Sequence, residues 1–416
     1  MFSEEFYNIY PRIQPLPEYD MKPDSIYHGI KAFFYDGADY KGKKTKVFAH
    51  IGFPEMKQGE RVPAVVLVHG GGGHAFPEWI RLWNERGFAA IAMDTTGFVP
   101  REDKKGLLVT ETATMPKDYV HELYGALSGQ GYTCGPDNSR MLDCDLPHDE
   151  QWMYHAIADT ILAHNILRRD ERIDREKIGI AGISWGGVIT SLAIGYDNRY
   201  AFAVPIYGTG HLDALTTPKL PSIFRDPKVK SLWSAADRFD KVCYPVLWKN
   251  WVYDTAFSVV GANMSYKDTQ KSGSMLSMSI EMGHSHIDAW KNEDGYRFAQ
   301  GIVGGFLPLI KPCEQPKGRG DISFGIEIPS DFSEITASVY YLTAPIEYGE
   351  DNRLTQSWTA LEARIENSTV YAFVPDDAVC YFVELKGTVN GKEYISDTEI
   401  IHPVGCPDSQ TLPYLI

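Results

Sequence analysis

The fold of this chain is decided by the stretch "IGIAGISWGGVIT" at residues 178–190. An apolar run leads into Gly182, Ser184 and Gly186, and the helix-like sequence "GGVITSLAIGYD" follows at once. A continuous aliphatic run is typical of a strand that is buried on both faces of a sheet. The pattern therefore predicts a strand, a tight turn that carries Ser184, and then a helix.

The segment "GISWG" within this stretch matches the pattern G-x-S-x-G, which forms the nucleophile elbow of α/β-hydrolases. Such a turn needs glycines because larger side chains would collide with the neighbouring strand and helix. The serine hydroxyl then lies at the helix N-terminus, where the partial positive charge favours a developing anion. A glycine-rich turn with an incidental serine is the alternative. The preceding strand and following helix favour the first interpretation and predict Ser184 as a nucleophile.

Strand and helix patterns alternate on both sides of the elbow. We expect buried strands at 63–70, 88–94, 177–183, 202–208 and 244–254, and helices at 77–87 and 149–169, with Asp149 capping the second helix. This alternation indicates a mostly parallel sheet with helices on both faces, as in the α/β-hydrolase fold. We assign residues 25–314 to this catalytic domain and the proline-rich residues 1–24 to an N-terminal arm. Residues 97–148, rich in Gly, Pro, Asp and Lys, are a long excursion typical of a lid.

Beyond residue 314 the pattern changes to a period of two without helical stretches. The dipeptide Asn390–Gly391 lies between two β-rich runs, which is a strong signal for a hairpin with a two-residue turn. We therefore predict that residues 315–416 form an all-β, sandwich-like domain. Its role as a carbohydrate binder, an assembly surface or a packing partner is open at this point.

The sequence "HGGGGH" at 69–74 follows the first buried strand. Its glycines allow backbone N–H groups to point into a site, as the oxyanion of an acyl-transfer reaction requires. We expect the N–H groups near Gly71 and Gly72, together with that of Trp185, to be the donors. A flexible loop or a phosphate cradle are the alternatives, but no G-K-[ST] sequence completes a phosphate-binding motif.

A serine nucleophile needs a base and an orienting acid, and in this fold they follow the serine in the order acid, then histidine. Asp254 ends the strand "YPVLWKNWVYD", and the loop "MGHSH" supplies His284, which we favour as the base, with His286 as the alternative. Asp237 and Asp240 are rival acids, but they precede that strand, and Asp254 could instead be a structural turn residue. The H-x-H spacing also permits a metal pair, but no further ligand can be assigned, so we expect neither a metal nor a cofactor.

Aromatic residues gather near these positions, and Tyr207 and Trp185 are candidates for contacting the substrate. Aromatic faces stack well on sugar rings. Large aromatic side chains are nevertheless more often part of a core than of a binding surface.

Composition narrows the choice of partners. The formal net charge of −15 disfavours nucleic acid and anionic membranes, and no apolar run reaches the length of a membrane span. The six cysteines are scattered without a CxxC pair, which argues against a zinc knuckle. The first residues lack the pattern of a secretory signal, so we expect a cytoplasmic protein.

Three segments carry a resemblance to a known family. The sequences "EQWMYHAIADTILAHNILRRDERIDREKIGIAGISWGG", "YAFAVPIYGTG" and "VHGGGGHAFPEWIRLWNERGFAAIAMD" resemble bacterial α/β-hydrolases of the acetylxylan esterase-like and dienelactone-hydrolase-like type. These are distantly similar to the prolyl-oligopeptidase superfamily, and the resemblance covers roughly residues 25–310. Two segments depart from the family pattern. "NWVYDTA" replaces N-G-T-N-D-x-A and "MGHSH" replaces M-P-H-G-H, which keeps the triad residue types and alters the pocket wall.

The resemblance implies a nucleophilic Ser184, an orienting Asp254 and a basic histidine in the "GHSH" loop. It implies a serine esterase that hydrolyses short-chain esters, acetyl esters above all, of a small molecule or an oligosaccharide. A peptidase or other acyl hydrolase with the same triad is one alternative, and a non-catalytic binding or scaffolding protein is another. A homo-oligomer is compatible with the sequence.

Overall fold

The computed structural model describes residues 1–101, 124–130, 134–137, 139, 141–214, 223–224, 226–349 and 353–403. Most of the predicted lid at 97–148 therefore lies outside the described residues. The chain forms two compact units, Met1–Pro205 and Ile206–Ile416. This division falls inside the range 25–314, and the predicted domain boundary at 314 stays a prediction.

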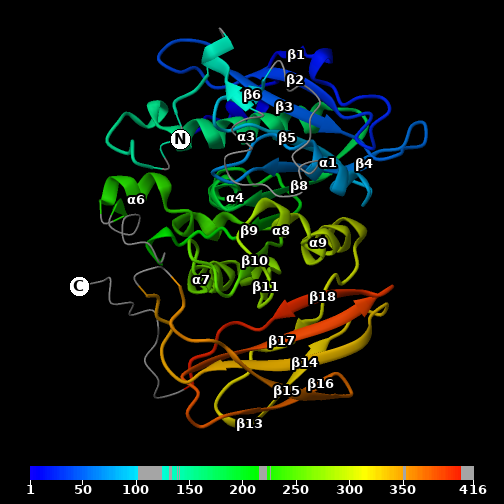
Figure 1. Cartoon of the computed structure of the whole chain (residues 1–416), viewed down its shortest axis with the longest axis vertical. Helices are drawn as coiled ribbons and strands as arrows, with labels where there is room; N and C mark the ends of the chain where they lie inside the picture. Colours follow the sequence, from blue (N-terminus) through cyan, green and yellow to red (C-terminus); the bar gives the residue numbers. More distant parts are fainter. Residues whose placement is uncertain are drawn as a thin grey trace. The chain divides into compact units, whose positions relative to one another are not determined.

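The first unit is built on a mixed sheet with the strand order β1-β2-β3-β5-β4-β8-β9 (Figure 1). The strands β1, β2, β3 and β5 pair antiparallel, whereas β5, β4 and β8 pair parallel. Their bounds are β1 Ile13–Pro15, β2 Lys31–Asp36, β3 Lys46–Gly52, β4 Val62–Val68, β5 Ala89–Met93, β8 Ile173–Ile183 and β9 Ala203–Ile206. An antiparallel entry followed by a crossover between β5 and β4 is the arrangement of an α/β-hydrolase, which confirms the predicted fold class.

The central strands are buried because helices cover the sheet. In β4 the register pairs Val66 with Ile91 of β5 and with Ile180 of β8, and all three side chains are fully buried. The helices are α1 Pro77–Asn84, α3 Trp152–Arg169 and α4 Trp185–Tyr196; α1 packs on β3 and β5, and α3 packs on β4, β5, β8 and α4. The prediction that helices pack on a sheet of buried apolar strands is therefore confirmed.

The start of α3 differs from the prediction. His148–Glu150 form a short 3-10 turn, and the helix begins at Trp152 rather than at Asp149. Asp149 does not cap it, because the carboxylate of Asp143 accepts the N–H of Trp152 at 2.7 Å. A residue from the preceding loop therefore satisfies a helix N-terminal donor that the sequence pattern assigned to Asp149.

The second unit contains the parallel pair β10 (Leu247–Trp251) and β11 (Met275–Ser279). Helices α6 (Pro227–Trp233), α7 (Val259–Thr269), α8 (His286–Trp290) and α9 (Glu293–Gly304) belong to the same unit. Strand β11 ends at Ser279, ahead of the loop that carries His284. The indole N–H of Trp251 donates to the carbonyl of Ile280 at 3.1 Å, so the first carbonyl after the strand accepts a hydrogen bond from a side chain.

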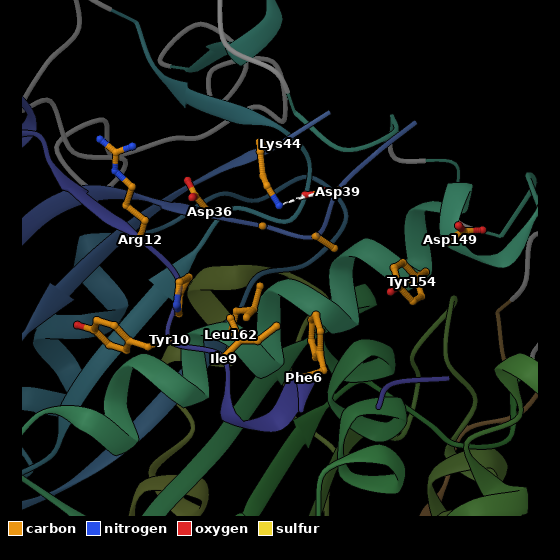
Figure 2. A pocket seen from close by; sticks show the side chains of 13 residues that line it. Phe6, Ile9, Tyr10, Arg12, Asp36, Asp39, Lys44, Asp149, Tyr154 and Leu162 are labelled. Atoms are coloured by element: carbon orange, nitrogen blue, oxygen red, sulfur yellow. Dashed lines mark hydrogen bonds and ion pairs between the residues drawn. The ribbon is translucent and has the colours of Figure 1, made fainter. Parts of the chain in front are cut away.

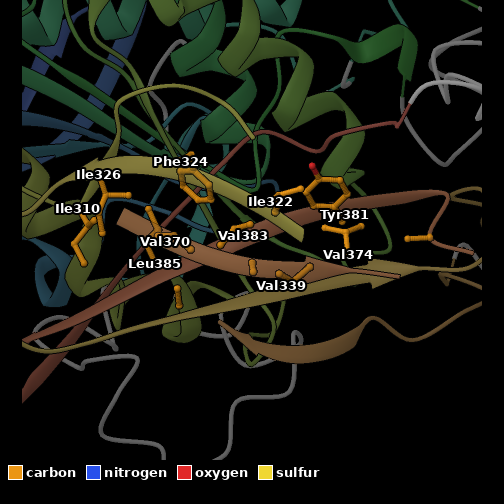
Figure 3. Close-up of a cluster of buried hydrophobic side chains, with 13 residues drawn as sticks. Ile310, Ile322, Phe324, Ile326, Val339, Val370, Val374, Tyr381, Val383 and Leu385 are labelled. Carbon is orange, nitrogen blue, oxygen red and sulfur yellow. The ribbon is translucent and has the colours of Figure 1, made fainter. Parts of the chain in front are cut away.

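The C-terminal part of this unit is all-β, as predicted. Its strands are β12 Lys311–Pro312, β13 Gly320–Glu327, β14 Ser333–Leu342, β15 Thr359–Glu366, β16 Thr369–Val374, β17 Cys380–Val389 and β18 Lys392–Asp397, in the order β18-β17-β14-β15-β16-β13-β12. Inward-facing side chains form its core (Figure 3), among them Ile322, Phe324, Ile326, Val339, Val370, Val374, Val383 and Leu385. We call this part the β domain, and it comprises β12 to β18 with their connections.

The hairpin predicted at Asn390–Gly391 is confirmed. Val389 pairs with Lys392, and both turn residues have positive φ, 51° for Asn390 and 77° for Gly391. This is the conformation that a type I′ turn requires. At the other edge of this hairpin, β18 pairs antiparallel with β11 through Leu276 and Asp397.

The remaining elements are short. Strands β6 (Phe98–Pro100) and β7 (Tyr124–Ala126) form a two-stranded sheet. The 3-10 helices are η1 Phe6–Asn8, η2 Pro17–Tyr19, η5 Leu127–Gln130, η6 His148–Glu150, η7 Leu212–Ala214, η8 Ala236–Lys241 and η9 Gln270–Ser272. Within the described ranges, no helix has both the length and the apolar character that crossing a membrane requires.

Candidate active site

Ser184 occupies the turn between β8 and α4 in a strained backbone conformation. Its φ is 57° and its ψ is −119°, and it stands at the N-cap position of α4. A non-glycine residue with positive φ outside the left-handed helical region costs on the order of 1–3 kcal/mol and is found mainly at functional sites. The strain is therefore the geometry expected of a nucleophile elbow.

The glycines on either side of Ser184 are sterically required. A Cβ at Gly182 would lie 2.1 Å from the carbonyl oxygen of Gly186, and a Cβ at Gly186 would lie 2.1 Å from that of Val68 and 2.4 Å from that of His69. The first residues of α4 therefore press directly against the end of β4. This close approach explains the G-x-S-x-G spacing by backbone contact and leaves no space for an alternative residue.

The glycine loop at 69–74 begins at the end of β4, beside this contact. A backbone hydrogen bond of 2.9 Å from Gly73 N–H to the carbonyl of Gly70 closes a turn around Gly71 and Gly72. Gly72 is exposed, and a Cβ there would meet no atom within 4 Å. The predicted oxyanion donors thus belong to an ordered turn, and their role stays a prediction.

Histidines at both ends of the glycine loop anchor it. The Nε2 atom of His69 accepts the backbone N–H of Thr95 at 3.0 Å, and its Nδ1 faces the carbonyl of Gly70 at 2.7 Å. Burial lowers the pKa of His69 to about 4, so the ring is neutral and can serve as an acceptor. His74 binds Asp94 through Nδ1 and Oδ2 at 2.7 Å.

Asp94 is the buried centre of this anchor. Besides His74, its carboxylate accepts the backbone N–H groups of Thr96 at 2.8 Å and Phe98 at 2.9 Å. Burial alone would raise the pKa of Asp94, but the hydrogen bonds and the charge interaction with His74 outweigh it and lower that pKa. Sequence reasoning missed His69, His74 and Asp94 as site-building residues. The signal was available, since histidine brackets the glycine run and Asp94 follows the next strand.

Trp185 directly follows the serine and is mostly buried. Its ring makes an edge contact with Trp152, with 6.3 Å between ring centroids, and the indole N–H of Trp152 donates to the carbonyl of Thr95 at 2.7 Å. The side chain of Trp185 is thus held by α3. Its backbone N–H, the predicted oxyanion donor, belongs to the first turn of α4.

In the second unit, Asp254 and His284 are hydrogen-bonded to each other. Nδ1 of His284 lies 2.5 Å from Oδ2 of Asp254, whose side chain is completely buried. The other carboxylate oxygen accepts the N–H groups of Ala256 at 2.8 Å and Phe257 at 2.7 Å. The acid is therefore fixed by its own loop, and it orients the imidazole through Nδ1.

Tyr207 and Phe257 enclose the imidazole of His284. The Tyr207 ring stacks on it with 4.7 Å between centroids, and Phe257 stacks at 6.0 Å. The Tyr207 hydroxyl donates to the carbonyl of Gly283 at 2.6 Å, and burial raises the pKa of this phenol well above its usual range, so it remains a donor. Tyr207 was predicted to contact the substrate. The contacts of its hydroxyl and ring are made to the histidine loop.

His286, the alternative base, lies in a different environment. It is the first residue of α8, and its ring centroid is 6.4 Å from that of Trp290. The structure pairs Asp254 with His284, whereas His286 begins a helix that Ser285 caps by accepting the N–H of Asp288. Among the residues that the structure describes, no group of three His, Cys, Asp or Glu side chains is placed to hold a metal ion.

A cavity of about 450 Å³ lies in the first unit, between the N-terminal arm, the turn after β2 and helix α3 (Figure 2). Lys44 and Asp39 form an ion pair of 2.8 Å at its rim. The lining residues are Phe6, Ile9, Tyr10, Pro11, Arg12, Asp36, Gly37, Ala38, Asp39, Lys44, Asp149, Tyr154 and Leu162. None of the predicted site residues is among them, so this cavity is separate from the candidate active site.

Comparison with known families gives one match. Residues 148–239 match the prolyl oligopeptidase family, and this range contains the Ser184 elbow. The matched range is less than half of the chain. Together with the elbow geometry it supports a serine hydrolase. No curated protein matches the sequence.

Solved structures of similar fold include two acetyl xylan esterases. The enzyme from Paenibacillus sp. R4 is 18% identical, with a TM-score of 0.49 over 72% of this chain and 91% of that chain. Acetyl xylan esterase 1 from Thermoanaerobacterium sp. JW/SL YS485 is 14% identical, also with a TM-score of 0.49, over 72% and 93% of the two chains. A putative dienelactone hydrolase from Klebsiella pneumoniae subsp. pneumoniae MGH 78578 is 16% identical, with a TM-score of 0.39 over 66% and 97%.

Proposed function

We propose that this protein is a serine esterase in which Ser184 is the nucleophile, His284 the general base and Asp254 the orienting acid. The observation that carries the proposal is the hydrogen bond of 2.5 Å between His284 Nδ1 and the buried Asp254 carboxylate. This bond fixes the imidazole tautomer in which Nε2 can accept a proton. The strained turn at Ser184, which is the geometry expected of a nucleophile elbow, also supports the proposal.

In the proposed reaction, His284 Nε2 takes the hydroxyl proton of Ser184 while the serine oxygen attacks the acyl carbon. The N–H groups of Trp185 and of the turn at Gly71 and Gly72 stabilise the resulting oxyanion. The carbonyl re-forms, the alcohol leaves with the proton from His284, and an acyl-serine remains. A water molecule activated by His284 then hydrolyses the acyl-serine and regenerates the enzyme.

For the substrate, we propose short-chain esters, acetyl esters above all, on a small carbohydrate or oligosaccharide. This choice follows the sequence resemblance to acetylxylan esterase-like hydrolases at the elbow and the glycine loop. The match of residues 148–239 to the prolyl oligopeptidase family supports a second candidate, a peptidase with the same triad. The two candidates share the acyl-serine chemistry and differ in the leaving group.

The test compares the wild-type chain with Ser184→Ala on three substrates: 4-nitrophenyl acetate, acetylated xylo-oligosaccharides and a proline-containing peptide anilide. We expect acetate release by the wild type and its loss in Ser184→Ala. Ser231→Ala, which changes an exposed serine hydroxyl on α6, is the matched control and should retain full activity. Cleavage of the anilide without acetate release would favour the peptidase. Absence of turnover and of phosphonate labelling at Ser184 would instead leave a non-catalytic binding protein.

A further inference from the structure

We infer that the β domain positions the catalytic acid, and that Tyr253 and Trp358 are the residues through which it does so. The inference rests on the proposed function, in which Asp254 is the orienting acid, and it adds a role for the β domain. The residues involved all belong to the second compact unit, Ile206–Ile416. The contacts form an unbroken series from buried aromatic side chains on β14 and β17 to the residue beside Asp254.

The series begins at β17. The ring of Phe382, fully buried, makes an edge contact with Trp358 at 4.9 Å between centroids and stacks on Tyr340 of β14 at 5.2 Å. Trp358 is the last residue before β15 and is itself 7% exposed. Its position is therefore set by the packing of the β domain, because a large ring in a closely packed core has little freedom to move.

The next contact crosses to the loop of the catalytic acid. The backbone N–H of Trp358 donates to the phenol oxygen of Tyr253 at 3.1 Å, across 105 residues of sequence. Tyr253 directly precedes Asp254, and its ring makes an edge contact with Trp251 at the end of β10. A displacement of Trp358 would therefore act on the residue adjacent to the acid.

A second side chain from the same connection supports the other end of this loop. Tyr348 lies between β14 and β15, and its hydroxyl is buried beside Ser258 and the backbone of Val259, where α7 begins. Burial raises the pKa of Tyr348, and the nearby negative charge of Asp254 raises it further. The loop 252–258 is thus contacted by the β domain both at Tyr253 and at Ser258.

The strand that leads into this loop is also tied to the β domain. The ammonium group of Lys249 in β10 is buried and lies 2.6 Å from Oδ2 of Asp294, and the other oxygen of Asp294 accepts the N–H of Ile395 in β18 at 2.7 Å. A buried ion pair with these additional hydrogen bonds has a well-defined geometry, because each displaced partner would leave an unpaired charge. The loop 252–258 therefore follows a strand, β10, that is linked to β18 through Lys249 and Asp294.

This arrangement has a chemical consequence. Asp254 orients His284 through a single hydrogen bond, so the direction of Nε2 depends on where the loop 252–258 lies. Misplacement of a reacting group by about 1 Å can cost on the order of 100-fold in rate. Tyr253 and Trp358 are thus positioning residues, which act on the reaction through Asp254.

The experiment measures kinetics and a spectroscopic signal in Tyr253→Phe, Trp358→Ala and the conservative Trp358→Phe. The signal is the far-downfield proton resonance of the His284–Asp254 hydrogen bond, assigned by its loss in His284→Gln. Tyr371→Phe and Phe373→Ala are the matched controls, because both residues are exposed on β16 of the same β domain.

For Tyr253→Phe we expect a drop in kcat of about 5-fold, the value of one neutral hydrogen bond, with KM unchanged and the resonance broadened by faster solvent exchange. Trp358→Ala should lower kcat by about 10-fold or more, and Trp358→Phe should recover most of the loss. In the double variant Tyr253→Phe/Trp358→Ala, the loss of kcat should be smaller than the product of the two single losses, because both residues act through one contact. Neither control should change kcat or the resonance.

The inference is overturned if Tyr253→Phe and Trp358→Ala, both folded, keep the wild-type kcat and a resonance of wild-type width. A drop in melting temperature without a change in kcat or in the resonance also contradicts it, because the role would then be structural only. If the wild type hydrolyses no ester but shows the resonance, the proposed function fails, and the resonance alone decides the positioning role. Should Trp358→Ala fail to fold, Tyr253→Phe decides the question through kcat and the width of the resonance.

Discussion

Replacing Gly186 by alanine is the sharpest test of the elbow, because it adds one carbon atom and removes none. The new Cβ would lie 2.1 Å from the carbonyl oxygen of Val68 and 2.4 Å from that of His69. Both obstacles are backbone atoms at the end of β4, and β4 pairs on both sides with buried strands. Neither can rotate away as a side chain could, so the turn itself has to move.

The size of the movement follows from these distances. An ordinary contact to a Cβ begins at 3.4 Å, so the start of α4 would have to retreat by about 1.3 Å from β4. Overpacking by a single carbon lowers the free energy of unfolding by about 1–3 kcal/mol. For Gly186→Ala we expect a loss of about 3 kcal/mol, because the atoms that the new Cβ meets belong to the backbone. For a compact unit of this size, that corresponds to a drop in melting temperature of roughly 6–12 °C. A shift of this kind at the nucleophile should lower kcat by about 100-fold.

The assay combines thermal melting with hydrolysis of 4-nitrophenyl acetate. Gly72→Ala is the matched control for stability, because a Cβ there meets nothing within 4 Å, and its melting temperature should stay close to that of the wild type. Gly182→Ala should behave like Gly186→Ala, since its Cβ would lie 2.1 Å from the carbonyl of Gly186. If Gly186→Ala melts within 2 °C of Gly72→Ala and keeps its activity, the close approach of α4 to β4 is wrong.

Three further predictions concern the titratable groups of the second unit. Asp254→Asn should lower kcat by about 10⁴-fold, because the amide favours the wrong imidazole tautomer of His284; a loss below 10-fold in steady-state kinetics would contradict the orienting role. His284→Gln should cost about 10³-fold or more in kcat and His286→Gln less than about threefold, and equal losses would reopen the choice of base. Burial alone would lower the pKa of His211, but its hydrogen bonds to acidic partners, Asp268 among them, raise it to about 9. Because this folded-state pKa exceeds the unfolded one, the stabilisation is complete below about pH 6.5 and is lost as the pH rises through 9. The loss should be about 1–2 kcal/mol given the partly exposed Asp268, and melting curves at pH 6 and 9.5 should show it in the wild type but not in His211→Gln.

The fold class was predictable because its signals are local or periodic. Continuous apolar runs identify β4, β5 and β8, and a glycine at 182 and 186 identifies a turn in which no side chain fits. The hairpin at Asn390–Gly391 was predictable for the same reason, since a type I′ turn needs two residues that tolerate positive φ.

The start of α3 was predicted wrongly because a long-range partner decides it. The pattern offered Asp149 as a cap, but Asp143 reaches the N–H of Trp152 from the preceding loop. The anchor of the glycine loop was missed for a related reason. His74 and Asp94 stand 20 residues apart, and only the pairing of β4 with β5 brings the ends of these strands together.

The sequence by itself thus determined the elbow, because the conformation of a strand–turn–helix unit depends on the residues within it and on the space that glycine leaves. It favoured His284 as the base but left His286 as the alternative, because the two histidines lie two residues apart in the same loop. The tertiary structure brings the Asp254 loop to His284 across 30 residues, and places His286 at the start of α8. It also gave the β domain its contact with Tyr253, across 105 residues. These contacts depend on how separate elements pack, and no local pattern of residues encodes them.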